Sequence, residues 1–370
     1  MPRYASKERK YIEDTFNWLH NHPEVGLETI ETGIFVAESL RSFGYEVIQN
    51  VGGHGVIGIW DTGLTGPLFA LRADMDALLF EVNGEHIAYH ACGHDAHSTI
   101  LLTTAKILKE KDLVKKGKLV LIFQPSEEDF RGAMSMINTG LLDDIEELIG
   151  IHITPKGVLS VGEACPAVYL GACTTLVAKI TGMNAHASTP HLGINASEIA
   201  SLLVSAVNCI HMDPNIPHSC KVTTIKTSTS SHNVIPDKAT LYWDIRTQTN
   251  ALSDELQTKI KTVITAICKA FGAKVEIKTH GSLASLHNDD TIELAKEVIT
   301  ELLGEAAPSR IESASDDFNY YSNELGIKTT YINIGAKASP NLHVYGMEFD
   351  HKAMEIGTDI FIGCTVKRLG

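Results

Sequence analysis

Residues 89–97 form the most informative stretch of the chain, and they read Tyr89-His90-Ala91-Cys92-Gly93-His94-Asp95-Ala96-His97. Regularly spaced apolar residues follow it and predict a helix over 98–109. Cys92 and His94 are therefore expected in the turn that enters a helix, where unpaired backbone N–H groups favour a thiolate. Cysteine and histidine are ligands of zinc-like ions and bind them in their deprotonated forms. The stretch thus indicates a metal site; the alternative is a free buried cysteine beside exposed histidines.

The length and composition of the chain set its broad class. A chain of 370 residues exceeds one average domain and suits two. Hydrophobic residues make up 44% of it, as in globular proteins, and no run of 18 apolar residues predicts a membrane span. The N-terminal segment is polar and has no apolar signal-peptide core. We therefore expect a cytoplasmic protein with no membrane partner.

Charge and cysteine usage exclude two further classes. The formal net charge is −14 and the lysines and arginines form no block, which disfavours nucleic acid as a partner. A small anionic substrate stays open, because a few local cations can bind it. The seven cysteines are spread singly and form no CxxC pair, so a disulfide framework is not expected.

Polar, chemically useful residues recur at the ends of predicted buried strands. They are Asp74 and Asp76 after strand 68–71, Glu127 and Glu128 after strand 118–123, and His152 within strand 147–153. An open α/β sheet places its chemistry at the carboxyl ends of its strands. Taken singly, each has a structural alternative: a capping aspartate pair, a solvated glutamate pair, or a hydrogen-bonded core histidine.

The middle of the chain has a different pattern. From about Tyr169 the predicted elements are strand 173–181, helix 194–212, strands 221–226 and 238–246, helix 253–271 and strand 274–278. This β-α-β-β-α-β order is that of the ferredoxin-like unit. The sequence therefore predicts an α/β catalytic domain of residues 1–168 and 282–370, interrupted by an α+β domain of residues 169–281.

Several motifs together resemble one known family. They are His22-Pro23-Glu24, His90-Ala91-Cys92-Gly93-His94-Asp95, Phe123-Gln124-Pro125-Ser126-Glu127-Glu128, Gly150-Ile151-His152, Ala185-His186-Ala187, Pro190-His191, Asn233-Val234-Ile235-Pro236 and Leu342-His343. In this order they resemble the amidohydrolase branch of the aminoacylase/glutamate-carboxypeptidase dinuclear metallopeptidases. That branch includes hippurate hydrolases, auxin-conjugate hydrolases and N-acetyldiaminopimelate deacetylases. The resemblance implies a zinc-peptidase-like domain, with a mixed sheet flanked by helices, and an inserted lid and dimerisation domain.

The resemblance also implies roles for individual residues. The metal ligands would be Cys92, His94, Glu128, His152 and His343. Cys92 would bridge two ions, in the place that other branches fill with an aspartate. Glu127 would be the general base and Asp76 a support behind the ligands. His186 would reach the substrate's carbonyl oxygen from the partner subunit of a homodimer, while His191, Asn233 and Arg246 would bind the polar end of the substrate.

The implied reaction is the hydrolysis of an amide bond in a small N-acyl amino acid carrying an N-acetyl, N-benzoyl or aryl-acyl group. Two divalent ions per subunit would hold a bridging hydroxide and polarise the scissile carbonyl. Glu127 would move the proton, and its pKa should lie above the usual value in a partly dry site. A thiolate, three imidazoles and a carboxylate suit Zn²⁺ or Mn²⁺, with Co²⁺ and Ni²⁺ as further candidates.

The chain departs from the family pattern at four positions. Tyr89 replaces a usual Met, Leu79 a frequent Pro, Asp316 a Glu and Val344 a common Ser. None of these changes removes a ligand. They bear on substrate preference and pocket shape.

Three other functions remain as alternatives. A dipeptidase or an N-acetyl-diamino-acid deacetylase would use the same site. A metal-binding module without catalysis would keep the ligands alone. A Cys92 nucleophile paired with His94 is the third, although the two residues are only two positions apart and direct pairing is awkward.

Overall fold

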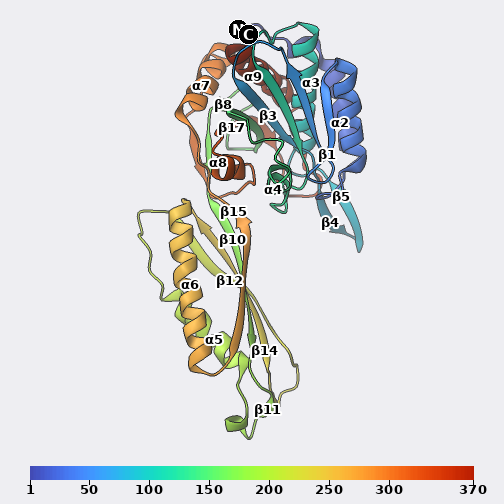
Figure 1. Cartoon of the computed structure of the whole chain (residues 1–370). Helices are drawn as coiled ribbons and strands as arrows, with labels where there is room; N and C mark the ends of the chain where they lie inside the picture. The colour runs from blue at the N-terminus through green and yellow to red at the C-terminus, as the bar shows by residue number, and fades with distance from the viewer. The chain divides into compact units, whose positions relative to one another are not determined.

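The computed structural model describes residues 1–370, and the chain divides into two units that each have their own core (Figure 1). Unit 1 comprises Met1–Tyr169, Leu286–Ile311 and Asp316–Gly370. Unit 2 comprises Leu170–Ser285 and Glu312–Ser315. The second boundary thus lies a few residues beyond the predicted position 281, because the last strand of unit 2 continues to Ser282.

Unit 1 is built on a seven-stranded mixed sheet in the order β1-β2-β6-β3-β7-β17-β8. The strands are β1 (Glu46–Val51), β2 (Gly55–Asp61), β3 (Leu68–Asp74), β6 (Lys118–Gln124), β7 (Glu147–Pro155), β8 (Ala164–Cys165) and β17 (Lys328–Ala338). The four neighbours β6, β3, β7 and β17 are mutually parallel. Their carboxyl ends therefore meet at one edge of the sheet, as expected for an open α/β sheet.

Helices flank this sheet. They are α1 (Arg9–His20), α2 (Ile30–Phe43), α3 (His94–Glu110), α4 (Gly132–Ile137), α7 (Asp289–Leu303), α8 (Asn319–Leu325) and α9 (Lys352–Leu369). Helix α3 packs against α1, α2 and α9 and shares their apolar core, whereas α4 and α8 contact each other and the strands β6 and β17. The predicted fold class is confirmed. No helix in the structure combines the length and the apolarity that crossing a bilayer requires.

Helix α3 begins four residues earlier than predicted, at His94, directly after Gly93. The φ of Gly93 is 92°, in the left-handed region, and a Cβ at this position would lie 2.4 Å from a side-chain carbon of Ile153. The prediction was wrong because apolar spacing starts only at residue 98. The first turn is instead buried through polar side chains, which an apolar pattern does not reveal.

Several short elements of the structure were not predicted from the sequence. They are the 3-10 turns η1 (Ala5–Lys7) and η2 (Pro190–Leu192) and the strands β4 (Leu78–Val82), β5 (Glu85–Tyr89), β9 (Val168–Leu170), β11 (Ala185–His186), β13 (Val234–Ile235) and β16 (Arg310–Glu312). For one pair a signal was present. Strands β4 and β5 form a hairpin through Asn83 and Gly84, with φ of 54° and 84°. Asn-Gly is the preferred dipeptide for such a tight turn.

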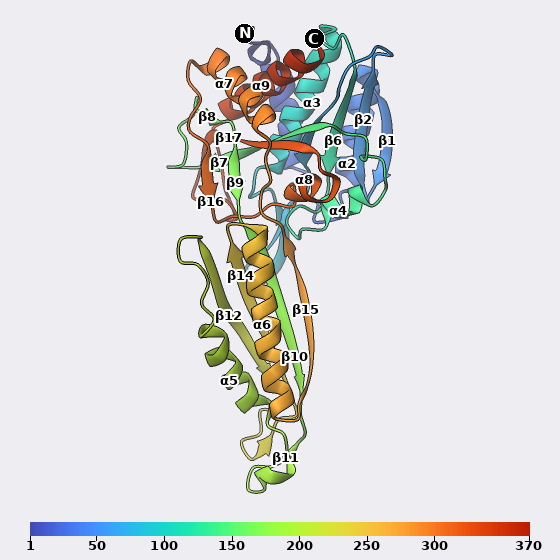
Figure 2. The same ribbon diagram turned by 60° about the vertical axis from the view of Figure 1, so that its left-hand side comes forward.

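Unit 2 is an antiparallel four-stranded sheet in the order β12-β14-β10-β15 with two helices packed on it (Figure 2). Its elements are β10 (Ala172–Thr181), α5 (Ala196–Asn208), β12 (His218–Thr227), β14 (Lys238–Thr247), α6 (Asn250–Ala270) and β15 (Lys274–Ser282). Alternate residues of β14 are buried, and they share one core with Leu203 of α5 and Ile260 of α6. The chain order is the β-α-β-β-α-β order that the sequence predicts.

We predict that Ile260→Ala lowers the free energy of unfolding by about 2–5 kcal/mol, because Ile260 is fully buried and its loss leaves a cavity. Chemical denaturation would measure this loss. The control is Leu202→Ala on α5, where the side chain is 40% exposed and we expect a change within about 0.5 kcal/mol. Equal losses in the two variants would contradict the described core of unit 2.

Candidate metal centre

Asp76 ties together the ends of two neighbouring parallel strands. It lies just beyond β3, and its two carboxylate oxygens accept hydrogen bonds from the backbone N–H groups of Glu127 (3.0 Å) and Glu128 (3.2 Å), just beyond β6. Ser126, before the two glutamates, has a φ of 60°, an uncommon conformation for a residue other than glycine. The tight turn at Ser126 and the two hydrogen bonds to Asp76 fix the backbone that carries the glutamates.

Two histidines are held so that one particular ring nitrogen is left for a ligand. The Nδ1 of His94 donates to the carbonyl oxygen of Asp76 at 2.8 Å, and the Nδ1 of His152 donates to the carbonyl oxygen of Ile153 at 2.6 Å. A ring that donates through Nδ1 has its lone pair on Nε2 when it is neutral. Hydrogen bonding of the remote ring nitrogen is typical of histidines that bind metals.

The structure brings the five predicted ligands together around one sulfur. The Nε2 atoms of His152 and His343 lie 3.4 and 3.3 Å from the Sγ of Cys92. Glu128 lies 3.5 Å from the Nε2 of His343 and 3.8 Å from that of His94, measured to its nearest carboxylate oxygens. The loop of His343 is tied to the cysteine motif, because the backbone N–H of His343 donates to the carbonyl oxygen of Ala91 at 2.7 Å.

The ligand atoms fall into two groups that have Cys92 in common. One group is Cys92, His94 and His152, and the other is Cys92, Glu128 and His343; within each, the candidate ligand atoms lie within 4.8 Å of one another. Glu127 lies against both His94 and Glu128 in a further group of this kind. This arrangement has the form of a two-ion site with one shared ligand.

Unpaired buried atoms test whether ions fit these residues. The Nε2 of His94 and the Oε1 of Glu128 are buried without a hydrogen-bond partner. They lie 3.8 Å apart, which is too far for a hydrogen bond. A transition-metal ion makes bonds of roughly 2.0–2.2 Å to imidazole nitrogen and carboxylate oxygen, so an ion in each of the two groups could satisfy the unpaired atom of that group. The donor set therefore fits a divalent ion.

Burial changes the protonation of the cluster. Burial, with Glu128 nearby, raises the pKa of the Cys92 thiol well above its usual value. Burial also raises the pKa of Glu128 to about 7 and, with Asp316 and Glu128 nearby, that of Glu127 well above its usual value, as predicted for Glu127. Burial lowers the pKa of His152. A bound cation would favour the charged forms of Cys92 and Glu128.

The predicted residues of unit 2 fall into two places. His186 in β11 is exposed, and its Nδ1 accepts from the backbone N–H of Ser188 at 3.1 Å, which leaves Nε2–H as a donor. The backbone N–H of Ala187 donates to the carbonyl oxygen of Asn233 at 2.9 Å, so Asn233 adjoins His186. His191 follows in the exposed turn η2.

Arg246 lies elsewhere in unit 2. It sits near the end of β14 that pairs with Ala172 and Cys173. The β11–β13 pair lies beyond the other ends of these two strands, because β11 comes after β10 and β13 comes before β14 (Figure 2). Arg246 lies eight positions along the strand from Lys238, a distance on the order of 25 Å. The structure therefore does not bring Arg246 to Asn233 within one copy. Its guanidinium instead pairs with Asp244 at 2.9 and 3.0 Å.

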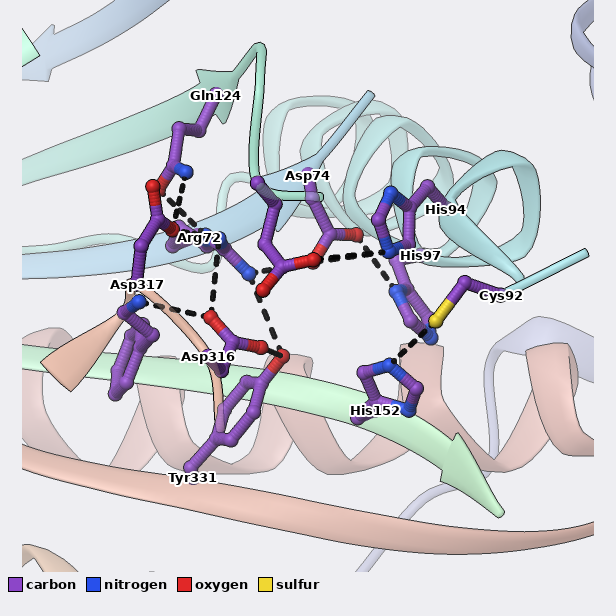
Figure 3. A network of polar contacts seen from close by, with 12 residues as sticks. Arg72, Asp74, Cys92, His94, His97, Gln124, His152, Asp316, Asp317 and Tyr331 are labelled. Carbon is purple, nitrogen blue, oxygen red and sulfur yellow. Dashed lines mark hydrogen bonds and ion pairs between the residues drawn. The ribbon is translucent and has the colours of Figure 1, made fainter. Parts of the chain in front are cut away.

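A buried network around Arg72 was not predicted from the sequence (Figure 3). Arg72 is fully buried in β3 and pairs with Asp74 at 2.5 Å and with Asp317 at 3.2 Å. Its Nε donates to Gln124 at 3.0 Å. The available signal was a charged residue within an apolar strand, since buried arginines are normally paired.

The comparisons with known proteins agree with this geometry. Residues 70–366 match the model of the family described as Peptidase family M20/M25/M40, and the chain belongs to this family. IAA-amino acid hydrolase ILR1-like 2 of Arabidopsis thaliana is 33% identical over 337 residues, which cover 84% of this chain and 76% of the relative. Hippurate hydrolase of Campylobacter jejuni is 31% identical over 370 residues, covering 95% and 94%.

A solved structure supports the fold. The Bacillus subtilis YXEP protein, described as a dinuclear metal binding peptidase from the M20 family, superposes with a TM-score of 0.81 at 23% identity and covers 98% of this chain and 99% of its own. Family membership and the relatives identify the chain as a metal-dependent hydrolase that acts on amide bonds.

We predict that Cys92→Ala removes both ions during dialysis, because this sulfur belongs to both ligand groups. The metal content of the dialysed protein, measured by elemental analysis, should fall from about two ions per chain towards zero. Cys364→Ala is the control, since Cys364 is equally buried but lies in α9 outside the cluster. A Cys92→Ala protein that keeps both ions would show that the sulfur is not a shared ligand.

Proposed function

We propose that this protein hydrolyses the amide bond of N-acyl amino acids with acetyl, benzoyl or aryl-acyl groups. One observation carries the proposal. The buried Glu127 belongs to neither ligand group that shares Cys92, and its carboxylate oxygen lies 3.8 Å from the Nε2 of the candidate ligand His94. Ligands alone would suffice for a binding module. A carboxylate that is placed beside them and only 6% exposed supports catalysis.

The residues that would hold two divalent ions are Cys92, His94, Glu128, His152 and His343, with Zn²⁺ or Mn²⁺ as the first candidates and Co²⁺ or Ni²⁺ after them. When bound, such ions activate water and polarise a carbonyl group. Asp76 would keep the site in shape, because it holds the backbone of both glutamates and the ring of His94 lies within 3.3 Å of it.

Glu127 would act as the general base. Its carboxylate would take the proton from the attacking water and return it to the leaving amine. The burial and the neighbouring carboxylates that raise its pKa make it a stronger base than an exposed glutamate. Because Glu127 is absent from both groups that share Cys92, it need not be a ligand.

Unit 2 would supply the substrate contacts and the dimer. We assign unit 1 to a catalytic domain and unit 2, Leu170–Ser285 with Glu312–Ser315, to a lid and dimerisation domain. His186 would donate from Nε2–H to the oxyanion, and Arg246 would bind the substrate's carboxylate. Since these residues lie at opposite ends of unit 2, they could serve one small substrate only from different copies, which supports a homodimer. Asn233 and His191 would then act beside His186.

We predict chelator-sensitive cleavage of N-acetyl, N-benzoyl or indole-acyl amino acids, with turnover restored by added Zn²⁺ or Mn²⁺. Release of the free amino acid would measure it across a panel that also contains simple dipeptides and N-acetyl-diamino acids. Preference for those last two classes would replace the proposed substrate by one of the alternatives. A metal-loaded protein inert across the panel would favour a binding module, and activity insensitive to chelation would favour a Cys92 nucleophile.

We predict that Glu127→Gln keeps its metal but loses at least about 10²–10⁴-fold in turnover, because an amide cannot accept the proton. His186→Ala should also be nearly inactive. Co-expression of the two variants should restore about a quarter of the wild-type activity, since only mixed dimers contain a complete site.

The control for the co-expression is a single chain that carries both Glu127→Gln and His186→Ala, because dimers of this chain contain no complete site. Glu305→Gln, an exposed carboxylate without a hydrogen-bond partner in the structure, controls for the chemical change. Near-full activity of Glu127→Gln alone would refute the base. A mixture as inactive as its components would refute donation of His186 between copies.

A further inference from the structure

His97 and Asp74 are buried beside the candidate metal ligands, but they belong to neither of the two ligand groups that share Cys92. Both ring nitrogens of His97 are used. Nδ1 lies 2.7 Å from the Oδ1 of Asp74 (Figure 3). Nε2 lies 3.0 Å from the backbone nitrogen of Ile153. A peptide N–H can only donate, so Nε2 is the acceptor and Nδ1 carries the proton.

The N–H of Ile153 needs this acceptor because the neighbouring strand has ended. The β3–β7 ladder stops at the pair Arg72 and Gly150, three residues before Ile153. An unpaired buried N–H costs about as much as a lost hydrogen bond. The imidazole of His97 therefore replaces the missing strand at this point of β7.

Ile153 in turn holds a candidate ligand. Its carbonyl oxygen accepts the Nδ1–H of His152 at 2.6 Å, and the Nε2 of the same ring lies 3.4 Å from the Sγ of Cys92. Ile153 thus accepts a hydrogen bond from His152 through its carbonyl oxygen and donates one to His97 through its N–H group. A displacement of its peptide groups would move the His152 ring.

The other end of this chain of contacts is rigid. Arg72 donates to the Oδ2 of Asp74 at 2.5 Å, and Arg72 is itself held by Gln124 and Asp317. A guanidinium has donors only, so it keeps an oxygen of residue 74 turned towards it. The remaining oxygen of Asp74 then faces His97 as an acceptor.

We propose that Asp74 and His97 are positioning residues for one of the two ions, the one that Cys92, His94 and His152 would hold. This inference rests on the ligand set of the proposed function. Neither side chain needs to touch the ion. Together they fix the tautomer of His97, the path of β7 at Ile153 and hence the direction of the His152 ring.

The first test is Asp74→Asn. The oxygen of the new amide would stay on Arg72, and its NH₂ group would face Nδ1 of His97. The proton of His97 would then move to Nε2. There it would face the N–H of Ile153, so that two donors meet and the hydrogen bond to Ile153 is lost. We expect one of two ions to bind roughly 10–100-fold more weakly, as for other residues behind metal ligands. Metal titration and elemental analysis after dialysis should show about one ion retained per chain, where the wild type retains about two.

The second test compares two changes of His97 itself. A glutamine oxygen can reach the position of Nε2 and accept from Ile153, whereas an asparagine amide reaches only the position of Nδ1. His97→Gln should therefore keep both ions better than His97→Asn. A third readout needs no metal: the ¹⁵N-histidine NMR spectrum of the metal-free wild type should show His97 protonated on Nδ1.

His287→Gln controls for the loss of a hydrogen-bonded imidazole, because His287 is half-buried and lies 2.8 Å from the carbonyl oxygen of Val168, away from this chain of contacts. It should retain both ions. If the wild type holds two ions and Asp74→Asn and His97→Asn hold them as tightly, the inference is overturned while the proposed function stands. If His287→Gln also loses both ions, the metal loss in the Asp74 and His97 variants would be explained by a general loss of protein stability, and the inference would fall. A wild type without ions would instead defeat the proposed function.

Discussion

Uncompensated negative charge in the interior is the constraint on which this structure depends. Carboxylates gather at one edge of the unit 1 sheet, and the groups there are Asp74, Asp76, Glu127, Glu128, Asp316 and Asp317, all mostly buried. The buried guanidinium of Arg72 lies among them and forms ion pairs with Asp74, Asp316 and Asp317. Buried charges are stable only when they are paired. Towards Cys92 the compensation must come from protons or from metal ions, which explains the raised pKa of Glu127 and Glu128 in the protein alone.

The topology concentrates this charge. Parallel pairing of β6, β3, β7 and β17 places the segments that follow their carboxyl ends at one edge of the sheet. Hydrogen bonds then set the details: Asp76 holds both glutamates, and backbone carbonyls hold the rings of His94 and His152. The ligand groups are thus built on strand ends and a helix start, which are rigid elements that suit a defined coordination geometry.

Much of this arrangement was predictable, and the reasons for the failures are physical. Apolar strands followed by carboxylates and His152 revealed the edge of the sheet, and the β-α-β-β-α-β order revealed unit 2. Apolar spacing could not place the start of α3, which is buried through polar contacts. His94 and His97 lie three residues apart in one helix, and only their hydrogen bonds separate a candidate ligand from a support. One partner of Arg72, Asp317, lies 245 residues away in the sequence, beyond any local pattern.

The most direct test is anomalous diffraction from crystals of the Zn²⁺- or Mn²⁺-loaded protein, recorded at the absorption edge of the metal. We expect two peaks about 3.5–4 Å apart, with the sulfur of Cys92 within bonding distance of both, near 2.3 Å for zinc. A single peak, or two peaks with that sulfur beyond bonding distance of either, would contradict the claim that one thiolate joins the two halves of the site.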